Sequence, residues 1–370
     1  MAQNPPRHGG NLHQAARRLG CRPQQLLDFS ASLVPFGPPA RLRGVLRRAL
    51  SGGPAAALVA YPDRSYCELR EVIALHHGID ASAVLPGNGA AELFTWAARD
   101  AAGLGVNTLL APGFVDYQRA LACWHGRWRS QLLQLPHREA GPQALVEALA
   151  EPLPPLPGPL WITNPHNPTG QLWSRESLLQ LLEQVPLLVV DEAFLPLLPH
   201  GEQQSLLPLA AQHPRLVVIR SLTKLCAIAG VRLGYAVATP QRLHQWAQWR
   251  DPWPVNGLAA AAGIALITDH SWQRRVHRWL GEEGPRLQQA LGRRPGLQVG
   301  PTAANYLLIS SEQSLQPLRL ELEQRHRILL RDCRSFEGLN ECWLRLAVLD
   351  RGRNQQLLRA LDQALTLDRA

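Results

Sequence analysis

Residues 186–194 read PLLVVDEAF, an apolar run that ends in a carboxylate. Similar runs flank it along the chain: VNTLLAP (106–112), PLWITN (159–164), RLVVIRSLTK (215–224) and LGYAVAT (233–239). Short apolar runs that alternate with helical patterns are typical of strands buried on both faces of a sheet. Segment 174–184 is one such helix, because Ser174 begins a capping-box-like pattern and leucines recur on one face. This alternation predicts an α/β fold with a mostly parallel central sheet covered by helices.

The 370 residues exceed one ordinary domain, and the pattern changes after about residue 265. Arg- and Gln-rich amphipathic helices are predicted beyond it, separated by the strand-like NYLLIS and CWLRLAV: 271–292, 312–326 and 353–367. We predict a large domain at 46–265 and a smaller α+β C-terminal domain at 266–370. The first 45 residues (1–45) are interpreted as an arm that contributes to the small domain and the active site. The proline-rich PLPPLPGP (152–159) is interpreted as a connection before a strand.

The cations of this chain are unusual, since 37 are arginines and only one, Lys224, is a lysine. Arginine and lysine are similar as solvated charges, but only an amine forms an imine with an aldehyde. Chance in an arginine-rich chain would explain a single lysine on its own. The role of Lys224 therefore has to be inferred from the residues around it.

The overall charge and cysteine pattern exclude several classes of function. The net charge is +9, yet the arginines are scattered, so we expect no nucleic-acid binding. The six cysteines form no C-x-x-C pair, so we expect reduced thiols and no metal site. No apolar run reaches 18 residues and the N-terminus is polar, so we predict a soluble, cytoplasmic protein with no membrane segment.

The stretch around Lys224 has the composition of a phosphate cup. Ser221 and Thr223 offer hydroxyl donors, and Arg232 follows in AGVRLGY with a guanidinium that can engage two phosphate oxygens. A glycine turn, GNG at 87–89, lies directly before a helical run whose first amides could also hold a phosphate. Taken alone, each of these segments would favour an ordinary turn, and Arg232 a surface arginine.

Two further side chains complete the requirements of pyridoxal 5′-phosphate (PLP). Asp191 ends its apolar run, where a carboxylate needs a cationic partner such as a protonated pyridine nitrogen; capping the next helix is the alternative. Asn167 lies in NPHNPTG (164–170), whose prolines and glycine predict a rigid turn that could hold the amide near the ring oxygen. We therefore hypothesise that Lys224 forms the Schiff base to PLP.

The motifs NPHNPTG, DEAF, SLTK and VRLGY, in this order, resemble the class I/II aminotransferase superfamily. The likeness extends along the chain through HGGN (8–11), YPD (61–63), PGNG (86–89), PGFVDY (112–117), DPWPVN (251–256), ANYLL (304–308), ILLRDC (328–333) and LRLAV (344–348). Within the superfamily the chain is similar to the histidinol-phosphate aminotransferase branch, and most of all to its threonine-phosphate decarboxylases. The resemblance implies a PLP-dependent transferase fold of type I and a homodimer with shared active sites.

The resemblance also implies a role for individual residues. Lys224 would be catalytic, and the residues that hold PLP would be Ala90, Ala91, Phe114, Asn167, Asp191, Ser221, Thr223 and Arg232, with Tyr61 reaching across from a second subunit. The residues around the substrate would be His8, Gly9, Ser32 and Arg331 at its phosphate, and Arg345 with Asn167 at its carboxylate.

The function that the resemblance implies is decarboxylation of L-threonine O-3-phosphate to (R)-1-aminopropan-2-yl phosphate, for corrinoid (cobalamin) biosynthesis. The alternative is transamination of histidinol phosphate or a related phosphorylated amine. Phe194, in place of the tyrosine that is usual in the aminotransferases, favours the decarboxylase. Ser32, in place of the decarboxylases' asparagine, leaves the phosphate contact open. A DNA-linked regulator on this fold is the third class of hypothesis. It would require a winged-helix extension, which we do not expect in this chain.

Overall fold

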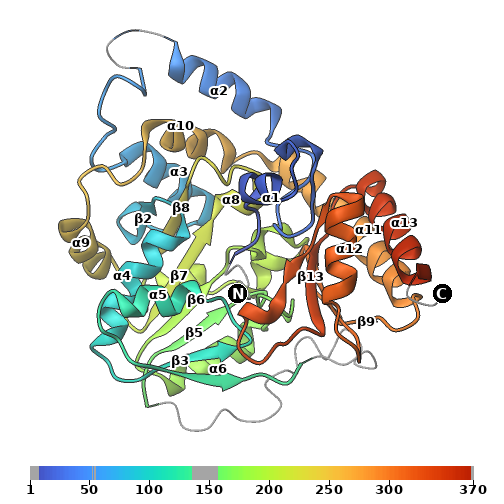
Figure 1. The fold of residues 1–370 in the computed structure, drawn as a ribbon. Coiled ribbons are helices and arrows are strands. Elements are labelled where there is room, and N and C mark those ends of the chain that lie inside the picture. Colours follow the sequence, from blue (N-terminus) through green and yellow to red (C-terminus); the bar gives the residue numbers. More distant parts are fainter. Residues whose placement is uncertain (1–7, 52, 54–55, 136–156, 368–370) are drawn as a thin grey trace.

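The computed structural model describes residues 8–51, 53, 56–135 and 157–367. Its largest sheet has seven strands, in the order β2-β8-β7-β6-β5-β3-β4 (Figure 1). All neighbouring strands are parallel except β8, which runs antiparallel to both β2 and β7. In sheet order the strands are β2 (Val84–Gly87), β8 (Gly234–Val237), β7 (Leu216–Ser221), β6 (Leu188–Asp191), β5 (Leu160–Thr163), β3 (Asn107–Ala111) and β4 (Trp128–Leu132).

The central strands are buried on both faces because helices cover each side of the sheet. On β6, Leu188 and Val190 belong to one apolar core, whereas Val189 between them belongs to another. This alternation is the period of two that a strand imposes on its side chains. It explains why the central strands are continuously apolar in sequence, as a sheet covered on both faces requires.

Thirteen α-helices occur in the described residues. Those associated with the large sheet or its edges are α2 (Ala40–Leu50), α3 (Cys67–His77), α4 (Ala90–Ala102), α5 (Asp116–Ala122), α6 (Arg175–Gln184), α7 (Leu207–Ala210), α8 (Leu222–Leu225), α9 (Pro240–Trp249) and α10 (Gly257–Leu266). The others are α1 (Leu12–Arg18), α11 (His270–Gly292), α12 (Gln316–His326) and α13 (Arg351–Leu367). The Ser174 hydroxyl accepts the backbone N–H of Ser177 at 3.1 Å, so the predicted cap of α6 is present.

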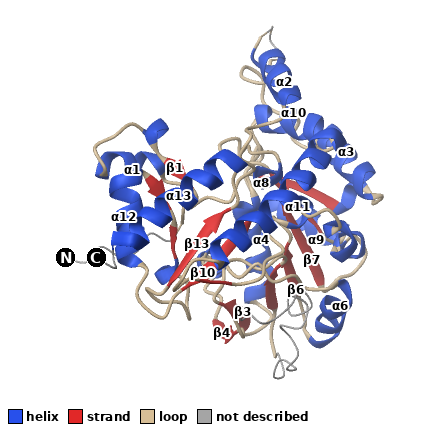
Figure 2. Ribbon diagram, turned by 90° about the vertical axis from the view of Figure 1, so that its right-hand side faces the viewer, coloured by secondary structure: helices blue, strands red, loops and turns tan. Residues whose placement is uncertain are grey.

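A second, antiparallel sheet lies beside the first and is packed against α11, α12 and α13 (Figures 1 and 2). Its strands in order are β12 (Arg331–Asp332), β13 (Trp343–Ala347), β10 (Tyr306–Ser310) and β9 (Gln298–Val299). The N-terminal segment joins this part of the molecule, because β1 (Leu27–Asp28) pairs in parallel with β11 (Ile328–Leu329). Helix α1 accordingly lies next to α12 (Figure 2).

The structure confirms the α/β fold with its mostly parallel, helix-covered sheet and a second, smaller sheet. One element was predicted wrongly: the run 215–224 is a strand only as far as Ser221, and Leu222–Leu225 form a helical turn. The Ser221 side chain caps that turn by accepting the N–H of Thr223. The domain limits at 45 and 265 stay predictions, and most of 152–159 lies outside the described residues. Across the described ranges, no helix is both long and apolar enough to cross a bilayer.

Candidate active site

One cavity of about 220 Å³ opens beyond the carboxyl ends of the parallel strands, where ligands bind in sheets of this kind. Every predicted site residue except Tyr61 lines it. These residues are His8, Gly9, Ser32, Ala90, Ala91, Phe114, Asn167, Asp191, Ser221, Thr223, Lys224, Arg232, Arg331 and Arg345. The fold therefore brings together segments that are up to about 340 residues apart in sequence.

Lys224 lies in the helical turn that follows β7, and its side chain enters the cavity half-buried. Its Nζ lies 5.5 Å from the centre of the Phe194 ring. Burial, together with the positive charges of Arg345 and Arg232, lowers the pKa of Lys224 to about 8, against the opposing charge of Asp191. Near neutral pH such an amine loses its proton far more readily than an exposed lysine, which suits a nucleophile.

Asp191 occupies the last position of β6 and is almost fully buried. Its carboxylate accepts hydrogen bonds from the Tyr117 hydroxyl at 2.7 Å and from the Ala193 N–H at 3.0 Å. Burial raises the pKa of Asp191 to about 6 although these hydrogen bonds act in the opposite direction. In this buried position the ionised carboxylate would be stabilised by a cationic partner in the cavity.

The predicted phosphate cup takes shape between the end of β7 and the start of α4. The Ser221 and Thr223 hydroxyls lie 2.6 Å apart. Arg232 adopts a left-handed backbone conformation, with φ of 63°, which is unusual for a residue other than glycine. Such a strained backbone is commonest where a side chain must be held in a functional site.

Glycines make room for this cup. A Cβ on Gly89, which has φ of +74°, would lie 2.6 Å from a terminal nitrogen of Arg232. A Cβ on Gly234 would lie 2.8 Å from the backbone nitrogen of Ala90, the first residue of α4. Glycine at both positions therefore lets the N-terminus of α4, with its unpaired amides, approach the guanidinium and hydroxyls.

Arg345 on β13 is a buried cation at the cavity wall. It donates a short hydrogen bond to the Asn167 side-chain oxygen and packs over the Tyr306 ring, 4.8 Å from its centre. Burial lowers the pKa of Arg345, although the guanidinium remains a cation at any physiological pH. The structure thus joins Asn167 and Arg345, the two residues predicted at a substrate carboxylate.

Arg331 on β12 lies beside Arg345 on the neighbouring strand. It donates to the backbone oxygen of Asp332 at 2.8 Å and to the Ser335 hydroxyl at 2.6 Å, and its guanidinium lies 4.9 Å from the centre of the Phe336 ring. These contacts restrict the orientation of the Arg331 side chain at the cavity wall.

The N-terminal arm supplies the remaining wall. His8 packs edge-on against Phe114, with ring centres 5.9 Å apart. Gly9 lies so close to Ser30 that an added Cβ would be 2.3 Å from the Ser30 carbonyl oxygen, and the Gly10 N–H donates to the Ser30 hydroxyl at 2.9 Å. The Ser32 hydroxyl is buried at the cavity and has no hydrogen-bond partner within the described part of the chain.

Tyr61 lies elsewhere, on the surface. Its side chain is 78% exposed and stacks on Trp253 at a ring distance of 4.3 Å. Because Tyr61 is expected to act on a second subunit, its position within one chain does not test that expectation.

Several residues of the site were not singled out from the sequence. Tyr117, which holds Asp191, also lies 2.8 Å from the Thr163 hydroxyl. Ser30 and Phe336 line the cavity, and so does Asp116, which pairs with Arg119 at 2.6 Å. Tyr117 ends the motif PGFVDY, which was a usable signal, whereas nothing in the sequence around Phe336 indicated its place.

The sequence of this chain is similar to known proteins along most of its length. Residues 25–361 match the family model of aminotransferase class I and II. The chain belongs to this family. It is 38% identical to threonine-phosphate decarboxylase of Salmonella typhimurium, over 97% of this chain and 96% of that protein. It is 28% identical to histidinol-phosphate aminotransferase 2 of Ralstonia nicotianae, over 96% and 93% of the two chains.

One solved structure has a similar fold. The histidinol-phosphate aminotransferase of Sinorhizobium meliloti, solved in complex with pyridoxal 5′-phosphate, superposes with a TM-score of 0.80 at 20% identity and covers 99% of this chain and 98% of its own. The chain therefore has the fold of the PLP-dependent aminotransferase family, and its site lies where a sheet of this kind binds ligands.

Proposed function

We propose that this chain is a PLP-dependent decarboxylase that converts L-threonine O-3-phosphate to (R)-1-aminopropan-2-yl phosphate, in corrinoid biosynthesis. The observation that carries this proposal is the end-to-end likeness to the Salmonella threonine-phosphate decarboxylase at 38% identity. The likeness to a histidinol-phosphate aminotransferase is weaker, at 28% identity over a similar length. Phe194, which cannot donate a hydrogen bond, supports the same choice.

The residues of the cavity fit PLP. The glycines at 89 and 234 leave a cradle that a Cβ would fill, and the Ser221 and Thr223 hydroxyls face it together with Arg232. These residues would hold the phosphate, with the first amides of α4. Asp191 would face the ring nitrogen, Asn167 the ring oxygen, Phe114 the ring face, and Lys224 would carry the cofactor. When bound, PLP supplies a sink for the electron pair that is left when a bond to the α-carbon breaks.

The other end of the cavity fits a phosphorylated amino acid. Its cations are Arg331 and Arg345, and the buried Ser32 hydroxyl adds an unused donor. Such a polyanionic substrate would offset the mutual repulsion of the two guanidinium groups. We assign Arg345 and Asn167 to its carboxylate, and Arg331, His8, Gly9 and Ser32 to its phosphate.

The reaction then depends on what these residues orient. The residues at the substrate carboxylate and those at the substrate phosphate together fix which bond of the α-carbon is oriented for cleavage. That orientation determines whether carbon dioxide or a proton is lost. Lys224, whose pKa is about 8, can deliver a proton to the α-carbon from its Nζ. The half-buried cavity and the arm over it limit the access of water.

We also propose a homodimer in which Tyr61 completes the partner's site. The exposed apolar side chains near Tyr61 support this, because Leu58, Val59 and Trp253 are 64%, 71% and 39% exposed. Patches of this kind mark interaction surfaces. Light scattering after gel filtration tests the assembly, and a monomer that retains full activity would contradict it.

Incubation of the holoenzyme with O-phospho-L-threonine tests the function. We expect release of carbon dioxide and formation of 1-aminopropan-2-yl phosphate, without a keto-acid acceptor. A second reaction contains histidinol phosphate and 2-oxoglutarate. Amino transfer in the second reaction and no carbon dioxide in the first would replace the decarboxylase with the aminotransferase.

A further inference from the structure

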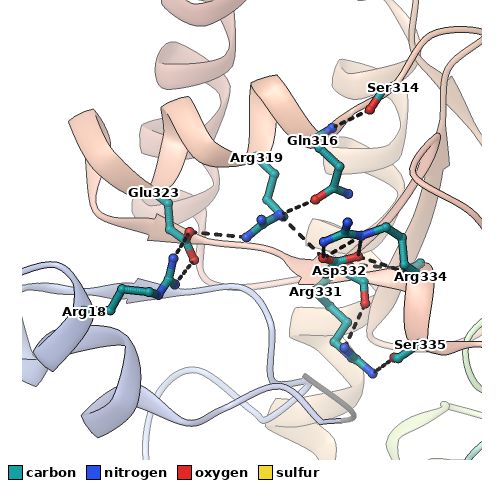
Figure 3. Close-up of polar contacts among 10 residues, drawn as sticks. Arg18, Ser314, Gln316, Arg319, Glu323, Arg331, Asp332, Arg334 and Ser335 are labelled. Carbon is teal, nitrogen blue, oxygen red and sulfur yellow. Dashed lines mark hydrogen bonds and ion pairs between the residues drawn. The ribbon is translucent and has the colours of Figure 1, made fainter. Parts of the chain in front are cut away.

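Four charged side chains form a continuous connection between the N-terminal arm and the strand that carries Arg331 (Figure 3). Arg18, in the last turn of α1, donates from both terminal nitrogens to the two carboxylate oxygens of Glu323, at 2.8 and 2.6 Å. Glu323 on α12 is only 5% exposed at its side chain, whereas Arg18 is 47% exposed. A two-bond fork of this kind fixes direction as well as distance.

The connection continues along α12 to β12. Arg319, one turn before Glu323, donates to the same carboxylate at 3.2 Å and lies 3.9 Å from the carboxylate of Asp332. Arg334 donates to Asp332 from Nε and a terminal nitrogen, the latter at 2.7 Å. Burial opposes ionisation of Asp332, but the hydrogen bonds from Arg334 and the charges of both arginines lower its pKa below the ordinary value. Asp332 therefore stays an anion between two cations.

Asp332 is adjacent to the substrate-side residue Arg331 and holds it through the backbone. The Asp332 carbonyl accepts from Arg331 at 2.8 Å, and Ser335, in the turn that Asp332 caps, accepts a second hydrogen bond from the same guanidinium (Figure 3). A displacement of Asp332 would therefore shift Arg331 at the cavity wall.

The arm needs this connection because its helix is short. Helix α1 has seven residues, too few to be stable by itself in water, so its position depends on contacts with the rest of the chain. His8 and Gly9 lie only a few residues before it and line the cavity. Anchoring α1 through Arg18 therefore helps to fix the place of His8.

We propose that Glu323 is a positioning residue for the phosphate end of the cavity. Glu323 is not among the residues that line the cavity. It acts on His8 and Gly9 through Arg18. It acts on Arg331 through Arg319 and Asp332. This rests on the proposed function, in which those residues bind the substrate phosphate.

The test compares Glu323→Gln with Glu321→Gln in the holoenzyme. Glu321 is a matched control on the same helix, because it forms an ion pair with Arg325 at 3.0 Å that is exposed on the α12 surface. Calorimetry with inorganic phosphate measures the affinity of the site, and steady-state kinetics with O-phospho-L-threonine separates KM from kcat. We expect Glu323→Gln to weaken phosphate binding and to raise KM, each about fivefold, with kcat changed less than about twofold. Glu321→Gln should change neither.

Arg18→Met provides a second variant in which Glu323 keeps Arg319 as its partner. We expect Arg18→Met also to weaken phosphate binding and to raise KM. The double variant, Arg18→Met with Glu323→Gln, should bind phosphate no worse than Glu323→Gln alone, because both changes break the same connection. Equal effects of Glu323→Gln and Glu321→Gln, or a lower kcat with unchanged phosphate affinity, would overturn the proposal. A wild-type enzyme that binds phosphate but releases no carbon dioxide would overturn the proposed function alone, since the phosphate titration still decides the role of Glu323.

Discussion

Arg331 and Arg345 are directly opposite each other on the antiparallel strands β12 and β13, so both side chains leave the sheet on the same face. Burial, and then the charge of Arg345, lowers the pKa of Arg331 to about 10. Two neighbouring cations in a partly buried cavity are unfavourable until an anion joins them. Their pairing thus prepares this wall of the site for a ligand with more than one negative group.

Replacement of Arg331 or of Arg345 should weaken substrate binding, but the two variants should differ in which ligands they affect. We expect Arg331→Gln to raise KM for O-phospho-L-threonine by roughly 10- to 100-fold, because charge-assisted hydrogen bonds to the phosphate are lost. Binding of L-threonine, which has no phosphate, should change little in Arg331→Gln and decrease in Arg345→Gln. A parallel loss for both ligands in Arg331→Gln would place that arginine at the carboxylate instead.

Lys224→Ala should abolish both attachment of the cofactor and turnover. No other lysine exists in the chain to replace it, so activity should fall by at least ~10³-fold. Borohydride reduction followed by mass spectrometry of peptides should find the cofactor on Lys224 in the wild type and on no peptide of the variant. Label on another residue of the wild type would contradict the assignment.

Gly89→Ala should disrupt the phosphate cup. The added methyl would contact the Arg232 guanidinium at 2.6 Å, at a backbone conformation with φ of +74° that disfavours alanine. We expect the Kd for PLP to rise by roughly tenfold or more. Gly230→Ala is the matched control, since no atom lies within 4 Å of its Cβ position. Equal PLP affinity of the two variants, measured by fluorescence titration, would argue against the cup.

Asp191 should make the stability of the apoprotein depend on pH. Burial raises its pKa from 3.8 to about 6, partly offset by the hydrogen bond from Tyr117, so folding favours the protonated form. The resulting stabilisation is complete below about pH 4 and is lost as the pH rises through about 6. Relative to Asp191→Asn, the wild-type free energy of unfolding should therefore fall by about 2 kcal/mol between pH 4 and pH 7. Urea unfolding of both apoproteins measures it, and a constant difference would contradict it.

Arg220, directly before Ser221, should be essential for the fold. It is 1% exposed and donates to Glu192 at 2.8 Å and to Glu202 at 2.8 and 2.9 Å. Arg220→Met would leave two carboxylates without their cation, and we expect a loss of about 3–5 kcal/mol in the free energy of unfolding. Arg215→Met, which breaks a surface pair with Glu183, should cost less than about 1 kcal/mol. Similar losses for both variants would show that the ion pairs of Arg220 contribute no more to the free energy of unfolding than the surface pair does.

Most of the cofactor side of the cavity could be predicted from local sequence. Asp191, Asn167 and the Ser221–Lys224 segment each end or follow a buried strand, and the carboxyl ends of parallel strands meet at one edge of the sheet. The pattern was misleading at 222–224, where an apolar run continues past the strand because Leu222 begins a buried helical turn. An apolar residue carries the same signal in both states.

The sequence by itself determined that Lys224 is the single lysine, the strand-helix alternation and the motifs that resemble the family. Only the tertiary structure decided that Arg331 faces Arg345, that Tyr117 holds Asp191, and that Arg18 binds Glu323 from 305 residues away. Local patterns record which face of an element is buried, because that depends on the period of the backbone. They do not record which buried or polar groups meet across elements, because that depends on how the sheets and the arm pack together.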